Sequence, residues 1–196
     1  MNIPVFLASD NNYAPFVATT IASICDNTKS FCDFYILNSG ITDENKEKIR
    51  KLKKQFNNFS LEFIEIDLNK YFKNFQENRY ITKSIYSRFL IPYLKPRIHK
   101  AIYLDIDVIF MGNINQLFCE RLDNYIIGAC LEQNAEYNLN SKRQMYLNLS
   151  DSHQYFCSGL LLIDCQQWRE KNITSKLFDS IKNLPPKLEC PDQDML

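Results

Sequence analysis

Short apolar runs alternate with amphipathic stretches along the first third of the chain. Residues 3–8, 32–37 and 61–66 are mostly apolar, as buried strands are. Between them, residues 13–25 and 43–56 carry apolar side chains at helical spacing, and Thr42 is placed to cap the second helix. Because strands that alternate with helices pair side by side, this order predicts a parallel sheet covered on both faces.

The pattern continues after residue 80 with less regular spacing. We expect Pro92 to end one helix, and Asp164 and Thr174 to cap two others. The predicted strands are residues 101–104, 126–131 and 159–163, and the predicted helices are residues 84–90, 164–168 and 174–184, with a first helical turn from Pro191. The sequence therefore predicts an α/β fold with a mainly parallel central sheet, in a single domain over residues 1–196.

Composition and charge narrow the class of protein. The 23 basic and 23 acidic residues cancel, which argues against a nucleic-acid partner held by bulk charge. The N-terminus lacks the basic segment and long apolar run of a signal peptide, and no stretch is apolar for the length of a membrane span. Seven irregularly spaced cysteines without a C-x-x-C pair indicate a reducing cytoplasm, with neither disulfides nor a zinc site.

One apolar run, AIYLDIDVIF at Ala101–Phe110, contains two carboxylates, Asp105 and Asp107. Residues two apart on a strand point to the same side, so both side chains could reach one divalent cation. Two oxygen ligands with no nearby Cys/His cluster favour Mg²⁺ or Mn²⁺. The D-x-D pattern alone is common by chance, and aspartates in a turn or paired with an arginine remain an alternative.

Two enzyme classes place a D-x-D pair at the end of a buried strand. A phosphohydrolase of the haloacid-dehalogenase type carries it on its first strand, whereas here three predicted strands precede it. A nucleotide-sugar transferase uses the pair to hold a metal on the diphosphate of its donor. The rest of the chain distinguishes the two classes.

Five segments occur in order along the chain, namely FLASDNNY, YSRFLIPYL, AIYLDIDVIF, FCSGLLLIDCQQWRE and PDQDML. Together they resemble glycosyltransferase family 8, which includes bacterial lipopolysaccharide glucosyl- and galactosyltransferases and glycogenin. The resemblance implies a GT-A fold and transfer of glucose or galactose from a UDP-sugar, with retention and with Mn²⁺ or Mg²⁺. It implies a glycan or glycolipid acceptor such as lipopolysaccharide core, and hence peripheral contact with the inner face of a bacterial membrane.

The same resemblance assigns residues to the donor site. Its implied uridine contacts are Asp10, Asn12 and Tyr13, its ribose neighbour is Ile106, its diphosphate-sugar contact is Arg88, and its metal ligands are Asp105 and Asp107. Near the hexose it places Glu132, Asp192 and Gln193. Asp192 would bind sugar hydroxyls, and Gln193 would lie under the anomeric carbon, so these two are the expected catalytic residues.

Two departures from the family pattern stand out. Cys157 occupies a position where the family has an amide, and a thiol is a poor hydrogen-bond donor. The family also continues past D-Q-D into a segment with a metal-binding histidine and a lysine, which neither His99 nor His153 replaces. We therefore expect a C-terminally shortened chain that binds UDP-sugar but transfers poorly and self-associates through uncovered apolar surface.

Overall fold

The computed structural model describes residues 2–77, 82–133, 145, 147, 149–150, 154–181, 188 and 190–196. In this part of the chain, strands form a six-stranded sheet in the order β3-β2-β1-β4-β6-β5. The strands are β1 (Ile3–Ser9), β2 (Cys32–Asn38), β3 (Phe59–Glu65), β4 (Lys100–Leu104), β5 (Ile127–Leu131) and β6 (Phe156–Asp164).

Strands β1 to β4 run parallel, and β6 pairs antiparallel with both β4 and β5. The predicted mainly parallel α/β sheet is therefore confirmed. The strand order reverses between β1 and β4, so the carboxyl ends of these two neighbours open at the same edge of the sheet. Parallel α/β folds bind their ligands at such a switch point.

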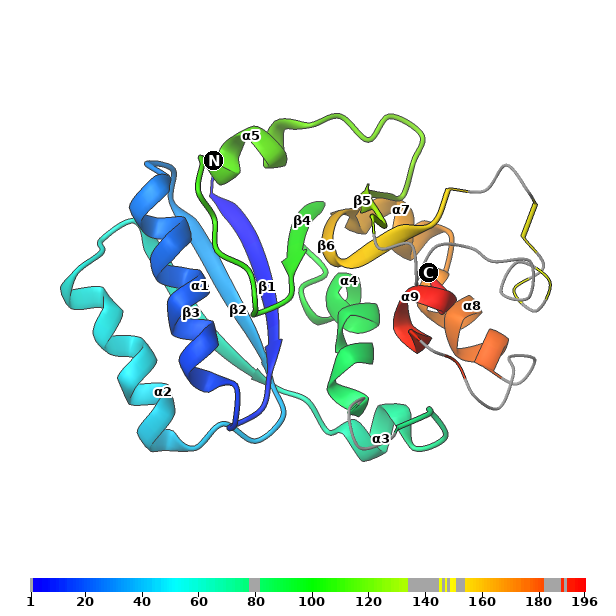
Figure 1. Ribbon diagram of the computed structural model, residues 1–196, viewed down its shortest axis with the longest axis horizontal. Helices are drawn as coiled ribbons and strands as arrows, with labels where there is room; N and C mark the ends of the chain where they lie inside the picture. The colour runs from blue at the N-terminus through cyan, green and yellow to red at the C-terminus, as the bar shows by residue number, and fades with distance from the viewer. Residues whose placement is uncertain are drawn as a thin grey trace.

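Helices cover both faces of the sheet (Figure 1). One face packs against an apolar cluster from α1 (Ala14–Asn27), α2 (Asp43–Arg50), its 3₁₀ extension η1 (Lys51–Lys54) and α5 (Ile114–Cys119). The other face packs against α3 (Leu68–Phe72), the 3₁₀ helix η2 (Lys83–Leu90), α4 (Ile91–Leu94), α7 (Cys165–Glu170) and α8 (Ile173–Ser180). The last helix, α9 (Pro191–Met195), lies beside β6. None of the helices in the described residues is both long and apolar enough to cross a lipid bilayer.

Three predicted helix boundaries were wrong, each for a local reason. Pro92 does not end the helical segment, because it lies in the first turn of α4, where a missing N–H costs little. The helix that begins after Thr42 tightens into η1 instead of continuing to Phe56. Thr174 does not cap α8, because its hydroxyl donates to the carbonyl of Phe89 at 2.6 Å and α8 begins after Asn172. The end expected for that helix at Leu184 lies outside the described residues.

Candidate active site

The loop after β1 is held by its own aspartate. Asp10 Oδ1 accepts hydrogen bonds from the backbone N–H groups of Asn12 at 2.9 Å and Tyr13 at 3.3 Å. This turn delivers Tyr13 to the start of α1, where its side chain is 54% exposed and its ring centroid lies 5.9 Å from that of Phe16. An aromatic face is thus open at the carboxyl end of β1.

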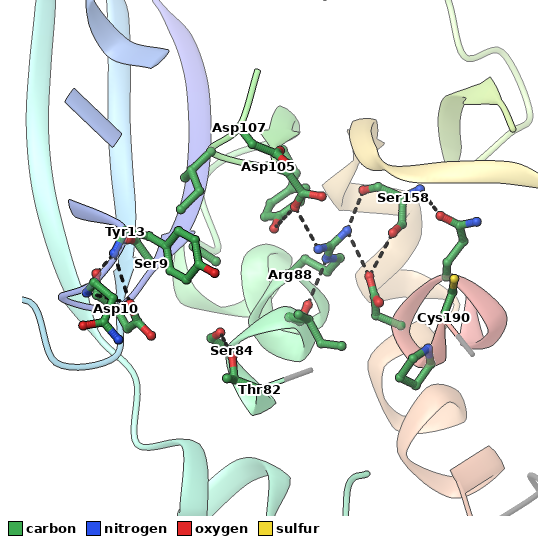
Figure 2. A pocket seen from close by; sticks show the side chains of 18 residues that line it. Ser9, Asp10, Tyr13, Thr82, Ser84, Arg88, Asp105, Asp107, Ser158 and Cys190 are labelled. Atoms are coloured by element: carbon green, nitrogen blue, oxygen red, sulfur yellow. Dashed lines mark hydrogen bonds and ion pairs between the residues drawn. The ribbon is translucent and has the colours of Figure 1, made fainter. Parts of the chain in front are cut away.

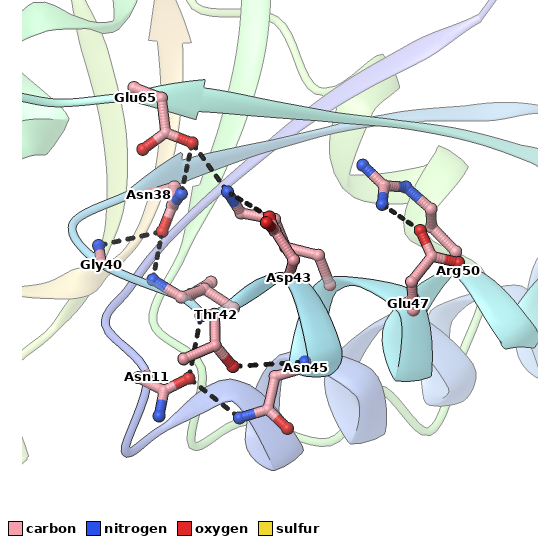
Figure 3. Close-up of polar contacts among 11 residues, drawn as sticks. Asn11, Asn38, Gly40, Thr42, Asp43, Asn45, Glu47, Arg50 and Glu65 are labelled. Carbon is pink, nitrogen blue, oxygen red and sulfur yellow. Dashed lines mark hydrogen bonds and ion pairs between the residues drawn. The ribbon is translucent and has the colours of Figure 1, made fainter.

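The same loop is fixed from outside by α2. Asn11 Oδ1 accepts from the backbone N–H of Thr42 at 3.0 Å and from Asn45 Nδ2 at 2.9 Å. Beside it, Asn38 bonds to Glu65, and Glu65 accepts from Lys46, which ties β2 and β3 to α2 (Figure 3). The position of the β1–α1 loop therefore depends on the start of α2.

Asp105 and Asp107 lie at the carboxyl end of β4, as predicted. They follow the strand in a turn, so the strand geometry expected to point both side chains the same way does not apply. Buried Thr20 of α1 holds this turn, since its hydroxyl lies 3.0 Å from the carbonyl oxygens of both Ile106 and Val108. Both aspartates nevertheless line one cavity, as predicted.

Arg88 forms ion pairs with both Asp105 and Asp192. Its Nη2 donates to Asp105 Oδ1 at 2.9 Å, and its Nη1 lies 3.1 Å from Asp192 Oδ2. Burial alone would lower the pKa of the Arg88 guanidinium, but the neighbouring Asp192 and Asp105 raise it overall, so the side chain stays charged. The arginine pair considered from the sequence as an alternative is therefore present.

Tyr103 completes the surroundings of Asp105. Its hydroxyl donates to Asp105 Oδ1 at 2.7 Å, and its ring lies 4.3 Å from the guanidinium carbon of Arg88. Burial raises the pKa of Tyr103 well above its usual range, so the hydroxyl remains a donor. Figure 2 shows Arg88 between Asp105 and Ser158, with Tyr13 towards one end of the cavity and Cys190 towards the other.

On the opposite wall, β6 holds α9 through Ser158. The Ser158 hydroxyl donates to Asp192 Oδ2 at 2.8 Å, and its backbone N–H donates to Gln193 Oε1 at 2.9 Å. Gln193 Nε2 in turn reaches Glu132 Oε2 at the long distance of 3.5 Å. Asp192 and Gln193 are thereby fixed side by side, with Glu132 behind them.

These segments enclose a cavity of about 610 Å³. Of the residues expected at the donor site, it is lined by Asp10, Asn12, Tyr13, Arg88, Asp105, Ile106, Asp107, Asp192 and Gln193, but not by Glu132. The sequence did not single out Ser9, Thr82, Ser84, Tyr103, Ser158 or Cys190, which also line it. Tyr103 and Ser158 could have been suspected as lone hydroxyls in apolar runs beside the aspartate motif and the glycine.

No histidine joins the described part of this site. His99 lies on the surface with its Nδ1 3.0 Å from Gln166 Oε1, and His153 falls outside the described residues. Among the residues described, no group of three or more His, Cys, Asp and Glu side chains could hold a metal ion.

The profile of the family described as Glycosyl transferase family 8 matches residues 4–196. The chain belongs to this family. A Haemophilus influenzae protein provisionally named a glycosyltransferase is 33% identical over 98% of the chain, and general stress protein A of Bacillus subtilis is 30% identical over 96%. A lipopolysaccharide 1,2-glucosyltransferase of Escherichia coli is 28% identical over 95%.

Solved structures give the same fold for this family 8 chain. LgtC, crystallised as the active-site mutant Q189E, superposes with a TM-score of 0.88 at 24% identity, covering 98% of the chain and 68% of LgtC. The expected GT-A fold is thus confirmed. The chain spans 57%, 63% and 55% of the three relatives named above.

Proposed function

We propose that this family 8 chain forms the donor-binding domain of a retaining hexosyltransferase. It would take glucose or galactose from a UDP-sugar and pass it to a glycan or glycolipid acceptor. The observation that carries this proposal is the convergence of an exposed aromatic ring, an aspartate pair and an Asp-Gln pair around one cavity. Membership of family 8 favours this activity over the phosphohydrolase considered from the sequence.

At the base end, Tyr13 would stack on uracil, with Asp10 and Asn12 shaping the loop beside it. Stacking of a base on an aromatic side chain contributes about 1–3 kcal/mol. Ile106 would then lie near the ribose, between this loop and the aspartate turn.

A divalent cation fits the middle of the cavity on chemical grounds. Asp105 Oδ2 and the carboxylate of Asp107 make no hydrogen bond within the described residues, and carboxylate oxygen is the ligand that Mg²⁺ and Mn²⁺ prefer. Bound there, Mn²⁺ or Mg²⁺ would neutralise the charge that develops on the leaving diphosphate. Asp105 and Asp107 would hold it, while Arg88 balances the charge of Asp105.

At the sugar end, Asp192 would accept hydrogen bonds from hexose hydroxyls, and Gln193 would lie under the anomeric carbon. Glu132 would act through Gln193, since it does not line the cavity. The acceptor class is supported by the Escherichia coli relative that is named a lipopolysaccharide 1,2-glucosyltransferase. A glycolipid acceptor would bring the protein to a membrane surface.

A thermal-shift titration tests donor binding first. We expect UDP-glucose or UDP-galactose to raise the midpoint of unfolding in the presence of Mn²⁺ and much less in its absence, because a ligand that binds only the folded state stabilises it. UDP release with a glycan acceptor then measures transfer. Metal-dependent binding without transfer would indicate a chain that binds the donor but does not catalyse transfer. Failure to bind any UDP-sugar would overturn the proposal.

A further inference from the structure

Two aspartates of the proposed donor site, Asp105 beside the proposed cation position and Asp192 at the sugar end, are held in the same way. Each has one carboxylate oxygen engaged twice, once by Arg88 and once by a buried hydroxyl. For Asp105 the engaged atom is Oδ1, with Arg88 Nη2 at 2.9 Å and the Tyr103 hydroxyl at 2.7 Å. For Asp192 it is Oδ2, with Arg88 Nη1 at 3.1 Å and the Ser158 hydroxyl at 2.8 Å.

The other oxygen of each carboxylate has no hydrogen-bond partner within the described part of the chain. A carboxylate oxygen offers about two acceptor sites, so the engaged oxygens are filled while Asp105 Oδ2 and Asp192 Oδ1 keep theirs. Two bonds to one oxygen from different directions also stop the carboxylate from rotating. The arrangement therefore presents one fixed, unoccupied oxygen from each aspartate.

Arg88 is committed to this arrangement. Its side chain is only 4% exposed, its Nε donates to the carbonyl of Ile85 at 2.9 Å, and its Nη1 also donates to the carbonyl of Ser158 at 2.6 Å. Bonds between a guanidinium and carboxylates are charge-assisted and geometrically specific. A guanidinium with these four contacts has little capacity left for the direct contact with the diphosphate-sugar that the resemblance implied.

We propose that Arg88, Tyr103 and Ser158 are positioning residues that divide the two aspartates into a held oxygen and a ligand-binding oxygen. The Tyr103 hydroxyl sets the oxygen that Asp105 offers to a divalent cation, and the Ser158 hydroxyl sets the oxygen that Asp192 offers to the hexose. This inference rests on the proposed function and assigns separate ends of the donor to the two hydroxyls.

The test removes one hydroxyl at a time. Tyr103→Phe keeps the ring beneath Arg88, and Ser158→Ala keeps both backbone contacts, so each change deletes one hydrogen bond to an aspartate. We measure by calorimetry the Kd of Mn²⁺ in the presence of UDP, and the ratio of the Kd values of UDP and the preferred UDP-hexose at saturating Mn²⁺. Because each hydroxyl acts on the ligand through an aspartate, we expect a change in Kd the size of one ordinary hydrogen bond, about three- to tenfold.

The chain supplies a matched control for each variant. Tyr86→Phe deletes an equally buried tyrosine hydroxyl that donates to the Gln76 carbonyl at 2.9 Å, away from both aspartates. Ser87→Ala deletes a buried serine hydroxyl that has no hydrogen-bond partner in the described residues, next to Arg88. Both controls report general effects of losing a buried hydroxyl near the site.

A crossed pattern supports the inference. Tyr103→Phe should weaken Mn²⁺ binding three- to tenfold and leave the ratio of UDP to UDP-hexose affinity unchanged, and Ser158→Ala should do the reverse. Equal losses of both quantities in the two variants, a shift in only one variant, or values matching Tyr86→Phe and Ser87→Ala would overturn it. Wild-type protein that binds no UDP-sugar would overturn the proposed function itself, which is a distinguishable result.

Discussion

At the residue scale, Gly159 sets how closely β6 approaches the aspartate turn. A Cβ at this position would lie 2.8 Å from Asp105 Oδ2, the oxygen left for a ligand. We expect Gly159→Ala to displace that oxygen and weaken Mn²⁺-dependent UDP binding by about tenfold, a loss comparable to one charge-assisted contact. Calorimetry measures it, with Gly112→Ala as the control, because a Cβ on Gly112 meets nothing within 4 Å. Equal binding by the two variants would contradict the close contact.

Tyr13 and Phe16 offer a second comparison between single residues. Their side chains are similarly exposed, at 54% and 50%, but only Tyr13 is among the residues that line the cavity. Tyr13→Ala should weaken uridine and UDP binding by a similar factor, about 5- to 150-fold, because the stacking contribution belongs to the base. Phe16→Ala should change both much less in the same titration. A loss for UDP with none for uridine would place Tyr13 at the phosphate end.

Single residues also mark the limit of what the sequence predicts. Asp105 and Asp107 were identified because two carboxylates interrupt an apolar run, and Tyr13 because its segment resembles a known family. The structure brings all three to one cavity. Tyr103 and Ser158 could have been suspected as lone hydroxyls in apolar runs, but the local sequence does not reveal their partners. Each hydroxyl acquires its role only when folding brings Arg88 between β4 and β6. Because Arg88 is buried only in the folded chain, its expected contact with the diphosphate-sugar could not be judged from sequence.

At the element scale, α1 supports the aspartate turn through Thr20, whose hydroxyl meets two carbonyl groups at 3.0 Å. Thr20→Val preserves shape and leaves these half-buried carbonyl groups without their donor, so we expect a loss of about 1 kcal/mol in the free energy of unfolding and weaker Mn²⁺ binding. Urea denaturation and calorimetry measure the two effects. Thr19→Val, one residue earlier and exposed, makes the same chemical change and should alter neither by a comparable amount. Similar losses in both variants would indicate an effect on the helix alone.

Helices and strands were predicted well where their own sequence pattern determines them. Their ends were predicted poorly where a contact with a distant segment determines them. Strands β1 to β3 follow from their own apolar runs, and the helices between them follow from apolar spacing. The start of α8 does not, because Thr174 is drawn into a contact with Phe89 from a distant segment. Helix ends depend on such tertiary contacts more than on local preference.

At the scale of the whole molecule, three buried thiols should make the free energy of unfolding depend on pH in the alkaline range. Burial raises the pKa values of Cys25, Cys32 and Cys165 from 9.0 to about 12. In the unfolded chain these thiols lose their protons near pH 9, while the folded protein retains them, so the unfolded state binds fewer protons above pH 9. The free energy of unfolding should therefore be unaffected by these groups below pH 9 and fall as the pH rises towards 12.

Urea denaturation at intervals between pH 7.5 and 11 measures this dependence. Cys165→Ala should reduce its slope, since one of the three buried thiols is gone, whereas Cys119→Ser changes an exposed residue and should leave the slope as it is. A free energy of unfolding that stays level to pH 11 would contradict the proposed role of burial.

The two attachments of α1 have a consequence for the length of ligand that the cavity accepts. Tyr13 is the residue that precedes this helix, and Thr20, in its second turn, contacts the aspartate turn. Seven residues of α-helix advance by roughly 10 Å, and this span cannot stretch without breaking backbone hydrogen bonds. The helix thus acts as a rigid spacer between the Tyr13 ring and the aspartates. The number of residues in this span sets the distance that a ligand must bridge to contact both. One residue inserted between Tyr13 and Thr20 would rotate the ring by about 100° around the helix axis and put the two ends out of alignment.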